Sequence, residues 1–431
     1  MDPAVLILLG SFLFMLLIRI PIAFSLGLST MFTAFYVGLP PMVVVQQMVK
    51  GINSFSLMAI PFFIIAGEIM GQGGISDRLI KLSNVLIGWL RGGLAMVNIL
   101  ASMFFGGISG SSVADVSSIG SILIPMMEQK GYDKDYSINV TITSSVQGII
   151  IPPSHNMIIY ALAAGGGISV ARLFLAGIVP GVLLGVALMI LSYYIAVKRG
   201  YPREDKISFK ESIKVVKDSV LGLLTAVIII GGVTTGVFTA TESAAIAAVY
   251  AFIITFFVYK DIKMVKMIDI LRNSLTTIAM VVAIIATSSG FAWMMSYLQV
   301  PTMITETLIG ISDNPIVILL LVNLILLILG TIMDMAPLIL IATPILLPVV
   351  TSIGMNPITF GVVMMLNLGV GLLTPPVGST LFVGCSIGNA PIEKIAKSLM
   401  PFYAVLVIMV LLLTFVPQLT LWLPQFLMGS L

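Results

Sequence analysis

Glycine, proline and hydroxyl residues are concentrated in two short stretches of an otherwise apolar chain. The first reads GGISGSSVAD (residues 106–115) and the second reads GIIIPPSHN (residues 148–156). A double proline inside a helix removes N–H donors and frees carbonyl oxygens, which together with nearby hydroxyls suit a hard cation. The unpaired N–H groups where a helix resumes suit an anion. These stretches predict the binding of a cation and an anion rather than the breaking of bonds.

Both stretches recur later in the chain at a constant offset, which is 223 residues because Gly107 matches Gly330. The later stretches read GTIMDMAP (330–337) and GLLTPPVGS (371–379). Paired broken elements in two repeats are typical of the midplane site of a secondary transporter. The residues that recur are Gly67, Gly107, Ile122, Leu123, Pro125, Gly148, Pro152 and Pro153, which match Gly290, Gly330, Ile345, Leu346, Pro348, Gly371, Pro375 and Pro376.

Composition determines which elements carry these stretches. Of 431 residues, 59% are apolar and 9% are charged, which a water-soluble globule cannot accommodate. Charge-free runs near bilayer length, without period-two alternation, predict membrane helices rather than a barrel. We therefore expect an all-α polytopic membrane protein. Its single cysteine, Cys385, excludes an internal disulfide, and the N-terminus lacks the basic region of a cleavable signal.

Each repeat is expected to contain five crossings, a re-entrant hairpin and a broken helix. In the first repeat the crossings are residues 4–18, 22–37, 55–71, 137–163 and 173–197, and the hairpin lies between about 93 and 127. An odd number of crossings makes the two repeats inverted. The predicted division is scaffold for 1–92 and 223–316, moving transport parts for 93–197 and 317–431, and a cytoplasmic amphipathic linker for 198–222, suited to anchoring at anionic lipid.

Basic residues predict the orientation. With the N-terminus in the periplasm, all of the 21 lysines and arginines except Lys50 and Arg172 fall on the cytoplasmic side.

Several long strings resemble the large membrane subunit of tripartite ATP-independent periplasmic (TRAP) transporters, and the resemblance extends over essentially the whole chain. The strings are GGISGSSVADVSSIGSILIPMMEQKGYD, IIIPPSHNMIIYALAAGGG followed by LFLAGIVPG, GVFTATESAAIAAVYAF, and NLGVGLLTPPVGSTLFV. The resemblance implies a sodium-driven importer of carboxylated solutes with an elevator-type ion-transporter-like fold. It also implies that the protein lies in the bacterial cytoplasmic (inner) membrane. It also implies two partners, a periplasmic substrate-binding protein and a small four-helix membrane subunit, which we expect to be a separate chain.

The same resemblance implies at least two sodium sites, each between a hairpin turn and the following break. The candidates for the first site are Ser109, Gly110, Ser111, Gly148, Ile150 and Pro152. The candidates for the second site are Gly330, Asp334, Gly371, Leu373 and Thr374. Close packing of small residues alone is the structural alternative.

No arginine lies in either turn or break, so we expect half-helix N-termini, amides and hydroxyls to hold the anion. The substrate-binding candidates are Ser112, Ser154, His155, Asn156, Ser379 and Thr380. Asp115 is interpreted as a helix cap, and Asp334 as either a cap or a sodium ligand. For Arg19 and Glu242 a role at a helix end is preferred to a partner contact.

Three alternatives differ in class. A stand-alone sodium/carboxylate symporter would explain the inverted repeats, but not the long TRAP-like strings. A membrane enzyme is disfavoured because the sequence offers no metal-ligand cluster, no nucleophile with a base, and one histidine. A channel is disfavoured because hairpins that meet at the midplane favour occlusion. The substrate stays open, with sialic acid placed ahead of a four-carbon dicarboxylate.

Overall fold

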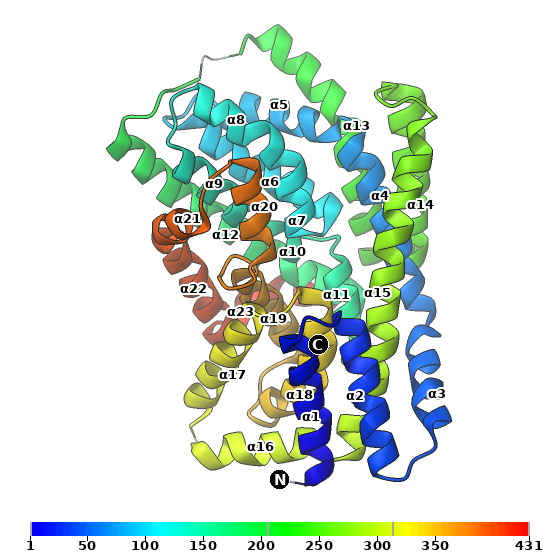
Figure 1. The fold of residues 1–431 in the computed structure, drawn as a ribbon. Coiled ribbons are helices and arrows are strands. Elements are labelled where there is room, and N and C mark those ends of the chain that lie inside the picture. The colour runs from blue at the N-terminus through cyan, green and yellow to red at the C-terminus, as the bar shows by residue number, and fades with distance from the viewer. Residues whose placement is uncertain (1, 205–206, 313, 430–431) are drawn as a thin grey trace.

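The computed structural model describes residues 2–204, 207–312 and 314–429, and these residues form an all-α protein (Figure 1). In the described residues, extended pairing is limited to one isolated bridge between Arg91 and Arg203. The predicted fold class, an all-α membrane protein built from two inverted repeats, is confirmed.

The first repeat begins with three helices and a 3₁₀ turn and continues through the hairpin and the broken helix to one long helix. Its elements are α1 (Pro3–Leu17), α2 (Ile22–Tyr36), α3 (Pro41–Ile52), η1 (Phe55–Met58), α4 (Ala59–Gln72), α5 (Ile75–Ile87), α6 (Gly93–Ser109), α7 (Ser112–Asp115), the π-helix η2 (Val116–Gly120), α8 (Ser121–Gln129), α9 (Lys134–Ser144), α10 (Gln147–Ile150), α11 (His155–Ala163) and α12 (Val170–Arg199).

The second repeat follows the same order near the expected offset, with some neighbouring elements fused. Its elements are α13 (Phe209–Thr234), α14 (Ala240–Ile253), the π-helix η3 (Ile254–Tyr259), α15 (Lys266–Tyr297), α16 (Val300–Ile311), α17 (Pro315–Gly330), α18 (Met335–Ser352), α19 (Pro357–Gly371), α20 (Ser379–Ile387), α21 (Ile392–Ser398), α22 (Met400–Phe415) and α23 (Gln418–Met428). Here α15 replaces α3, η1 and α4, and α18 replaces the three elements of the returning half-hairpin.

The hairpins of the two repeats lie in opposite halves of the molecule. In Figure 1, α6 and α8 occupy the upper half, while α17 and α18 occupy the lower half. The predicted breaks are also present, because α10 ends at Ile150 before α11 begins at His155, and α19 ends at Gly371 before α20 begins at Ser379. The inverted arrangement therefore brings two turns and two breaks toward the middle of the molecule.

Two details differ from the sequence expectation. Residues 4–18 and 22–37 form helices, but α1 and α2 have 15 residues each and are about 22 Å long, short of the roughly 30 Å hydrocarbon core. Arg19, with φ of 65°, and Pro21 interrupt the helical path between them. The amphipathic helices α5 and α16 lie where loops were expected, because neither is long enough to register as a crossing.

Among the described residues, five helices are long and apolar enough to span a membrane: Phe55–Gln72, α12, Ala240–Tyr259, α15 and α18. The bent pair α21 and α22, with 58° between them, makes a sixth if it counts as one span. The chain is therefore a multi-pass membrane protein, in which the shorter apolar helices complete the bundle.

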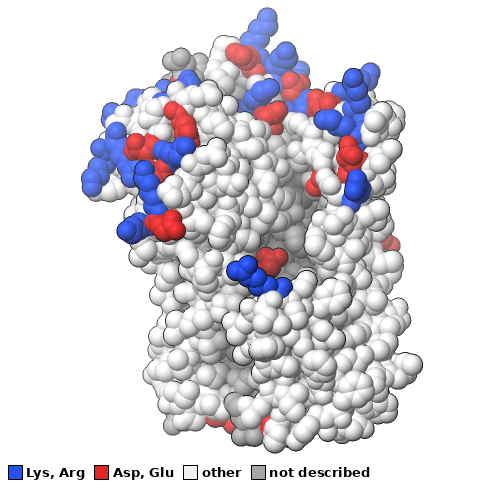
Figure 2. Space-filling model, in the orientation of Figure 1, with Lys and Arg blue, Asp and Glu red and all other residues white. Residues whose placement is uncertain are grey.

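Charged side chains gather at one end of the molecule, at the top of Figure 2, around α5, α8 and α13. On the face shown, the opposite end, where the chain begins, carries few charges, and one small cluster lies at mid-height. Five ion pairs of the described residues lie in segments that the sequence assigns to the cytoplasmic side: Arg78–Asp261, Lys130–Glu204, Lys134–Glu128, and Arg199 with Asp133 and Asp135. Such a one-sided distribution is what the positive-inside rule requires. The periplasmic placement of the N-terminus stays a prediction.

Candidate functional site

The first hairpin turn packs directly against the first helix break. A Cβ on Gly106, in α6, would lie 2.3 Å from the Cα of Gly148 in α10. A Cβ on Gly107 would lie 2.9 Å from the carbonyl oxygen of Pro152. Since backbones approach this closely only where side chains are missing, the glycines hold turn and break in contact.

Most of the first predicted sodium ligands meet at this contact. The Ser111 N–H donates to Ser109 Oγ at 3.4 Å, and Asn156 Nδ2 donates to the Gly110 carbonyl oxygen at 3.4 Å. Ile150 is different, because a Cβ on Gly177 of α12 would lie 2.0 Å from its carbonyl oxygen, which therefore faces α12. The residues that remain at the contact are Ser109, Gly110, Ser111, Gly148 and Pro152.

Asp115 does not cap a helix, contrary to its interpretation from sequence. Ser111 occupies the N-cap position of α7, where its Oγ accepts a hydrogen bond from the Ala114 N–H at 3.4 Å. Asp115 is the last residue of α7 and is fully buried beside the hydroxyl of Ser102. Within the described residues, no hydrogen bond of ordinary geometry reaches either carboxylate oxygen. A buried carboxylate without partners is costly, so Asp115 joins the candidates for cation binding.

The second turn and break are joined in a similar way. A Cβ on Gly371 would lie 2.5 Å from the carbonyl carbon of Gly330. The Val377 N–H in the break donates to the Thr331 carbonyl oxygen in the turn at 3.1 Å. This hydrogen bond closes the second contact directly, in addition to the glycine packing.

The second set of predicted sodium ligands is less concentrated. Thr374 Oγ1 donates to the Val370 carbonyl oxygen at 2.8 Å, and the Leu373 carbonyl oxygen accepts from the Tyr403 hydroxyl. Asp334 is exposed and occupies the N-cap position of α18 without a side-chain cap hydrogen bond. Its carboxylate is therefore available to a cation, while the Leu373 and Thr374 oxygens already have protein partners.

The predicted substrate residues form a central polar group between the repeats. Ser112 Oγ lies 3.0 Å from Thr380 Oγ1 of α20 and 2.6 Å from Ser145 Oγ. His155, at the start of α11, lies against Gly110, on which a Cβ would approach its Nδ1 to 3.1 Å. Ser154 and Ser379 complete the group, and among the described atoms their hydroxyls have no hydrogen-bond partner. Such hydroxyls, at the starts of two resumed helices, can donate to an anion.

A buried polar network behind the first turn was not anticipated. Asn98 Nδ2 donates to Thr141 Oγ1 at 2.7 Å, and Ser144 Oγ donates to Ser102 Oγ at 3.1 Å. Because Ser102 lies beside Asp115, the network extends the first turn into the helix packing. Polar residues at helical spacing in apolar helices were the available sequence signal.

Two further predictions concern helix ends and metals. Glu242 closes a capping box with Thr239 at the start of α14, which confirms its role at a helix end. In the part of the chain that the structure describes, no group of three or more His, Cys, Asp or Glu side chains is placed to hold a metal ion. Any cation at the turns would therefore depend on main-chain and hydroxyl oxygens and single carboxylates.

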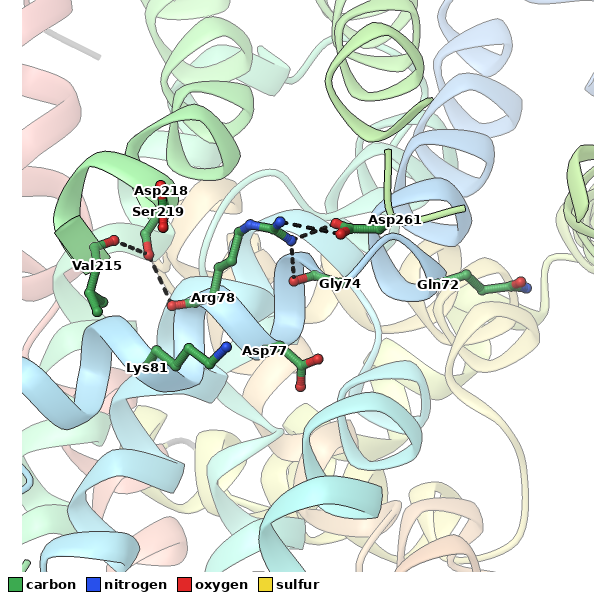
Figure 3. A pocket seen from close by; sticks show the side chains of 9 residues that line it. All are labelled: Gln72, Gly74, Asp77, Arg78, Lys81, Val215, Asp218, Ser219 and Asp261. Carbon is green, nitrogen blue, oxygen red and sulfur yellow. Dashed lines mark hydrogen bonds and ion pairs between the residues drawn. The ribbon is translucent and has the colours of Figure 1, made fainter. Parts of the chain in front are cut away.

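A polar cavity of about 440 Å³ at the charged end is lined by α4, α5, α13 and the segment after η3 (Figure 3). Arg78 donates to both Asp261 carboxylate oxygens, at 2.6 and 3.3 Å, and lies 3.7 Å from the centre of the Tyr259 ring. The Ser219 hydroxyl donates to the Arg78 carbonyl oxygen at 3.0 Å. The cavity contains neither a turn nor a break, and its contacts join the predicted scaffold segments of the two repeats.

Comparison with known proteins gives one family over nearly the whole chain. Residues 9–419 match the family model described as "Tripartite ATP-independent periplasmic transporter, DctM component". The sialic acid TRAP transporter large permease protein SiaM of Vibrio cholerae is 40% identical over 89% of this chain and 90% of its own length.

Two further relatives carry other substrate names. The isethionate TRAP transporter permease protein DctMQ of Oleidesulfovibrio alaskensis is 40% identical over 98% of this chain and 66% of its own length. The C4-dicarboxylate TRAP transporter large permease protein DctM of Vibrio cholerae is 36% identical over 96% of both chains. The crystal structure of the YdaH transporter of Alcanivorax borkumensis is similar in fold, with a TM-score of 0.61 and 12% identity over 85% of this chain and 86% of that one.

Proposed function

The chain belongs to the DctM family of tripartite ATP-independent periplasmic transporters, and from this premise we propose that it imports an organic acid by coupling to sodium. It is a transporter permease subunit and not an enzyme. Its proposed partners are a small four-helix membrane subunit on a separate chain and a periplasmic binding protein that delivers the solute.

The observation that carries the proposal is the contact between turn and break in each repeat. Each contact is formed by facing glycine backbones, Gly106 with Gly148 and Gly330 with Gly371. Hydroxyls, freed carbonyl oxygens and a carboxylate stand at or beside each contact, which is the oxygen-rich chemistry that sodium requires. Sodium at the two contacts would be a co-transported substrate, and its binding would fix each turn on its break.

Coupling follows if sodium binding completes the anion site between the repeats. Ser112 and Thr380, whose oxygens are 3.0 Å apart, connect the first turn to the helix after the second break. Ordering both contacts with sodium would therefore orient the central hydroxyls for the acid group. Uphill import requires nothing beyond tighter solute binding in the sodium-loaded state.

The proposed movement is of the elevator type. Residues 93–197 and 317–431 would move as one unit against a scaffold of residues 1–92 and 223–316. The polar cavity at Arg78 and Asp261 supports a fixed scaffold, because its contacts join α5 and α13 to the segment before α15. The seven basic residues between Lys198 and Lys217 would anchor the linker at anionic lipid.

For the solute we propose a carboxylate, with sialic acid as the first choice and a four-carbon dicarboxylate as the second. The relatives are named for sialic acid, isethionate and C4-dicarboxylates, and all of these are organic anions. The central hydroxyls and helix N-termini would suit the acid group that these solutes share.

The test is uptake of labelled sialic acid, succinate and isethionate into liposomes that contain the protein with its small subunit. Each solute is measured with and without its binding protein and with and without an inward sodium gradient. Uptake that requires both supports the proposal and identifies the solute. Uptake that requires the sodium gradient but no binding protein would favour a stand-alone symporter. Uptake at the same rate with and without the sodium gradient would contradict sodium coupling.

A further inference from the structure

A second cavity lies between the predicted scaffold and the predicted moving unit. It has a volume of about 460 Å³ and is bounded by α3, α15, α18 and the end of α11 with the loop that follows. Two of its walls, α3 and α15, belong to the predicted scaffold, while α11 and α18 belong to the predicted moving unit. In Figure 1, α3, α11 and α18 lie in the lower half, away from the charged end, and α15 runs down to them from the upper half.

The lining of this cavity is a mixture of polar and apolar residues and carries one positive charge. Lys50 and Gln47 lie one turn apart on α3, and Ser54 follows in the same wall. Among the described residues that line it, Lys50 is the one charged side chain, and no carboxylate of the described chain pairs with its ammonium group. Lys50 is also one of the two basic residues that the charge rule left on the periplasmic side. An unpaired ammonium group beside neutral donors favours an anion.

The adjoining scaffold wall, α15, offers a buried donor. Ser288 of α15 is 1% exposed, lines the cavity, and within the described residues its hydroxyl has no hydrogen-bond partner. Gly51 lets α3 approach α15, since a Cβ there would lie 2.1 Å from Ser289 Oγ. This close approach brings Lys50 to the same cavity as the unsatisfied hydroxyl.

The cavity is connected to the turns through two helices. From the first break, α11 runs from His155 to Ala163, about 12 Å at 1.5 Å per residue, and Ala163 lines the cavity. From the second turn, α18 starts at Met335 and reaches the cavity at Leu340, about 8 Å further on. The cavity therefore lies about 12 Å along α11 from the first break and about 8 Å along α18 from the second turn.

We propose that this cavity is an anion-binding vestibule in which Lys50 receives the carboxylate of the solute before the solute reaches the central hydroxyls. This inference rests on the proposed function and adds a residue that belongs to neither turn nor break. Because Lys50 stands on the scaffold wall and Ala163 and Leu340 on the moving wall, movement of the unit would separate the walls and release the anion from Lys50. Lys50 then contributes to solute capture, while sodium binding at the turns does not depend on it.

The first arm of the test is transport kinetics in the reconstituted complex with sialic acid and succinate. Lys50→Gln removes the charge and keeps a polar, unbranched side chain that is one atom shorter, Lys50→Arg keeps the charge, and Lys263→Gln is the control at the charged end. We expect Lys50→Gln to raise KM about tenfold, because this is the usual effect of losing one charge-assisted hydrogen bond to the solute. The kcat and the sodium dependence should stay within twofold of the wild type. Lys50→Arg should stay within threefold of the wild-type KM. An unchanged KM in Lys50→Gln, or an equal rise in Lys50→Arg, would overturn the vestibule.

The second arm measures occupancy without transport. In a Cys385→Ser background, Ser54→Cys places a thiol in the cavity wall, and its rate of reaction with a neutral maleimide is followed with added sialate, succinate or chloride. We expect the organic acids to slow the reaction, and Lys50→Gln to abolish this protection. Protection by organic acids without any uptake would keep the vestibule and overturn the proposed function. Uptake by the wild type without protection would overturn the vestibule and leave the proposed function in place.

Discussion

The first turn and break are buried and polar, whereas the second turn and break are partly exposed. Pro152, Pro153 and Ser154 are buried, while Pro375 and Pro376 at the matching positions are exposed. Both breaks pack against their turns through glycine, so the backbone arrangement is shared. The two regions differ in what surrounds that arrangement.

The polar network behind the first turn is largely absent from the matching positions of the second. Asn98, Ser102 and Thr141 match Leu321, Ile325 and Met364 at the offset of 223 residues. The carboxylates also stand at different positions, because Asp115 matches Leu338 and Asp334 matches Ser111. The repeat therefore preserves the contact between turn and break, while the polar groups that select an ion or a solute differ between copies.

The largest expected effect comes from filling the shared glycine contact. Gly106→Ala would place a Cβ 2.3 Å from the Gly148 Cα, and Gly371→Ala would place one 2.5 Å from the carbonyl carbon of Gly330. Backbone cannot yield as a flexible side chain can, so each change should cost about 1–3 kcal/mol or more. We expect both variants to lose more than 90% of sodium-driven uptake and to unfold at lower temperature, as measured by transport in liposomes and thermal unfolding in detergent.

A graded series tests whether packing alone explains this loss. At Gly330 a Cβ would lie 3.2 Å from the Gly371 Cα, so Gly330→Ala should be milder than the other two variants. Gly310→Ala, on α16, meets nothing within 4 Å and serves as the control. If Gly330→Ala were as damaging as Gly371→Ala, close packing would not be the cause.

Asp115 and Asp334 should differ in how their neutralisation changes the unfolding temperature. Asp115 is buried without a hydrogen-bond partner in the described chain, while Asp334 is exposed. Asp115→Asn should therefore raise the unfolding temperature in sodium-free buffer at alkaline pH, where the carboxyl group is ionised, because an unpaired buried charge is removed. Asp334→Asn should leave that temperature near the wild-type value.

The dependence of the unfolding temperature on sodium concentration should also differ between Asp115→Asn and Asp334→Asn. Sodium that binds the folded state raises the unfolding temperature with concentration. In Asp115→Asn we expect the sodium concentration that produces half of this rise in unfolding temperature to increase about 10–100-fold, because the cation would lose one charged ligand. Asp334→Asn should show a smaller change, since the Asp334 side chain is exposed while that of Asp115 is fully buried. A wild-type response to sodium in Asp115→Asn would exclude Asp115 as a cation ligand.

The sequence predicted the two repeats, both hairpins and both breaks because each depends on local signals, glycines and prolines, that recur at one offset. It could not predict that Asp115 is buried, because a carboxylate just after a turn matches a helix cap equally well. Ile150 was assigned by its position in the break, but the direction of its carbonyl oxygen depends on Gly177, 27 residues later in the chain. Lys50 was seen only as an exception to the charge rule, since the cavity that gives it a role is formed by four helices from both repeats.

The smallest expected effect concerns the helices that lead to the two breaks, α9 and α19. In the first copy the Tyr201 hydroxyl donates to Asp133 Oδ2 at 2.7 Å and Arg199 Nη1 lies 2.8 Å from the same oxygen. The hydrogen bond from Tyr201, followed by that from Arg199, holds the pKa of Asp133 below its usual value of 3.8. In the second copy Asn356 stands at the position of Asp133 and caps α19 by accepting from the Ile358 N–H at 2.8 Å.

This difference predicts opposite pH behaviour. Because the pKa of Asp133 is lower in the folded state, its contribution is complete above pH 3.8 and is lost as the pH falls through the folded value. Asp133→Asn should lower the free energy of unfolding by about 0.5 kcal/mol at neutral pH, the usual worth of an exposed pair, and this difference should shrink as the pH falls below 3.8 toward the lower pKa of the folded state. Asn356→Ala should cost about 1 kcal/mol at every pH, because a neutral cap does not titrate. Thermal unfolding of the three proteins between pH 3 and pH 7 measures both differences, and a pH-independent loss in Asp133→Asn would show that its hydrogen bonds, rather than its charge, stabilise the start of α9.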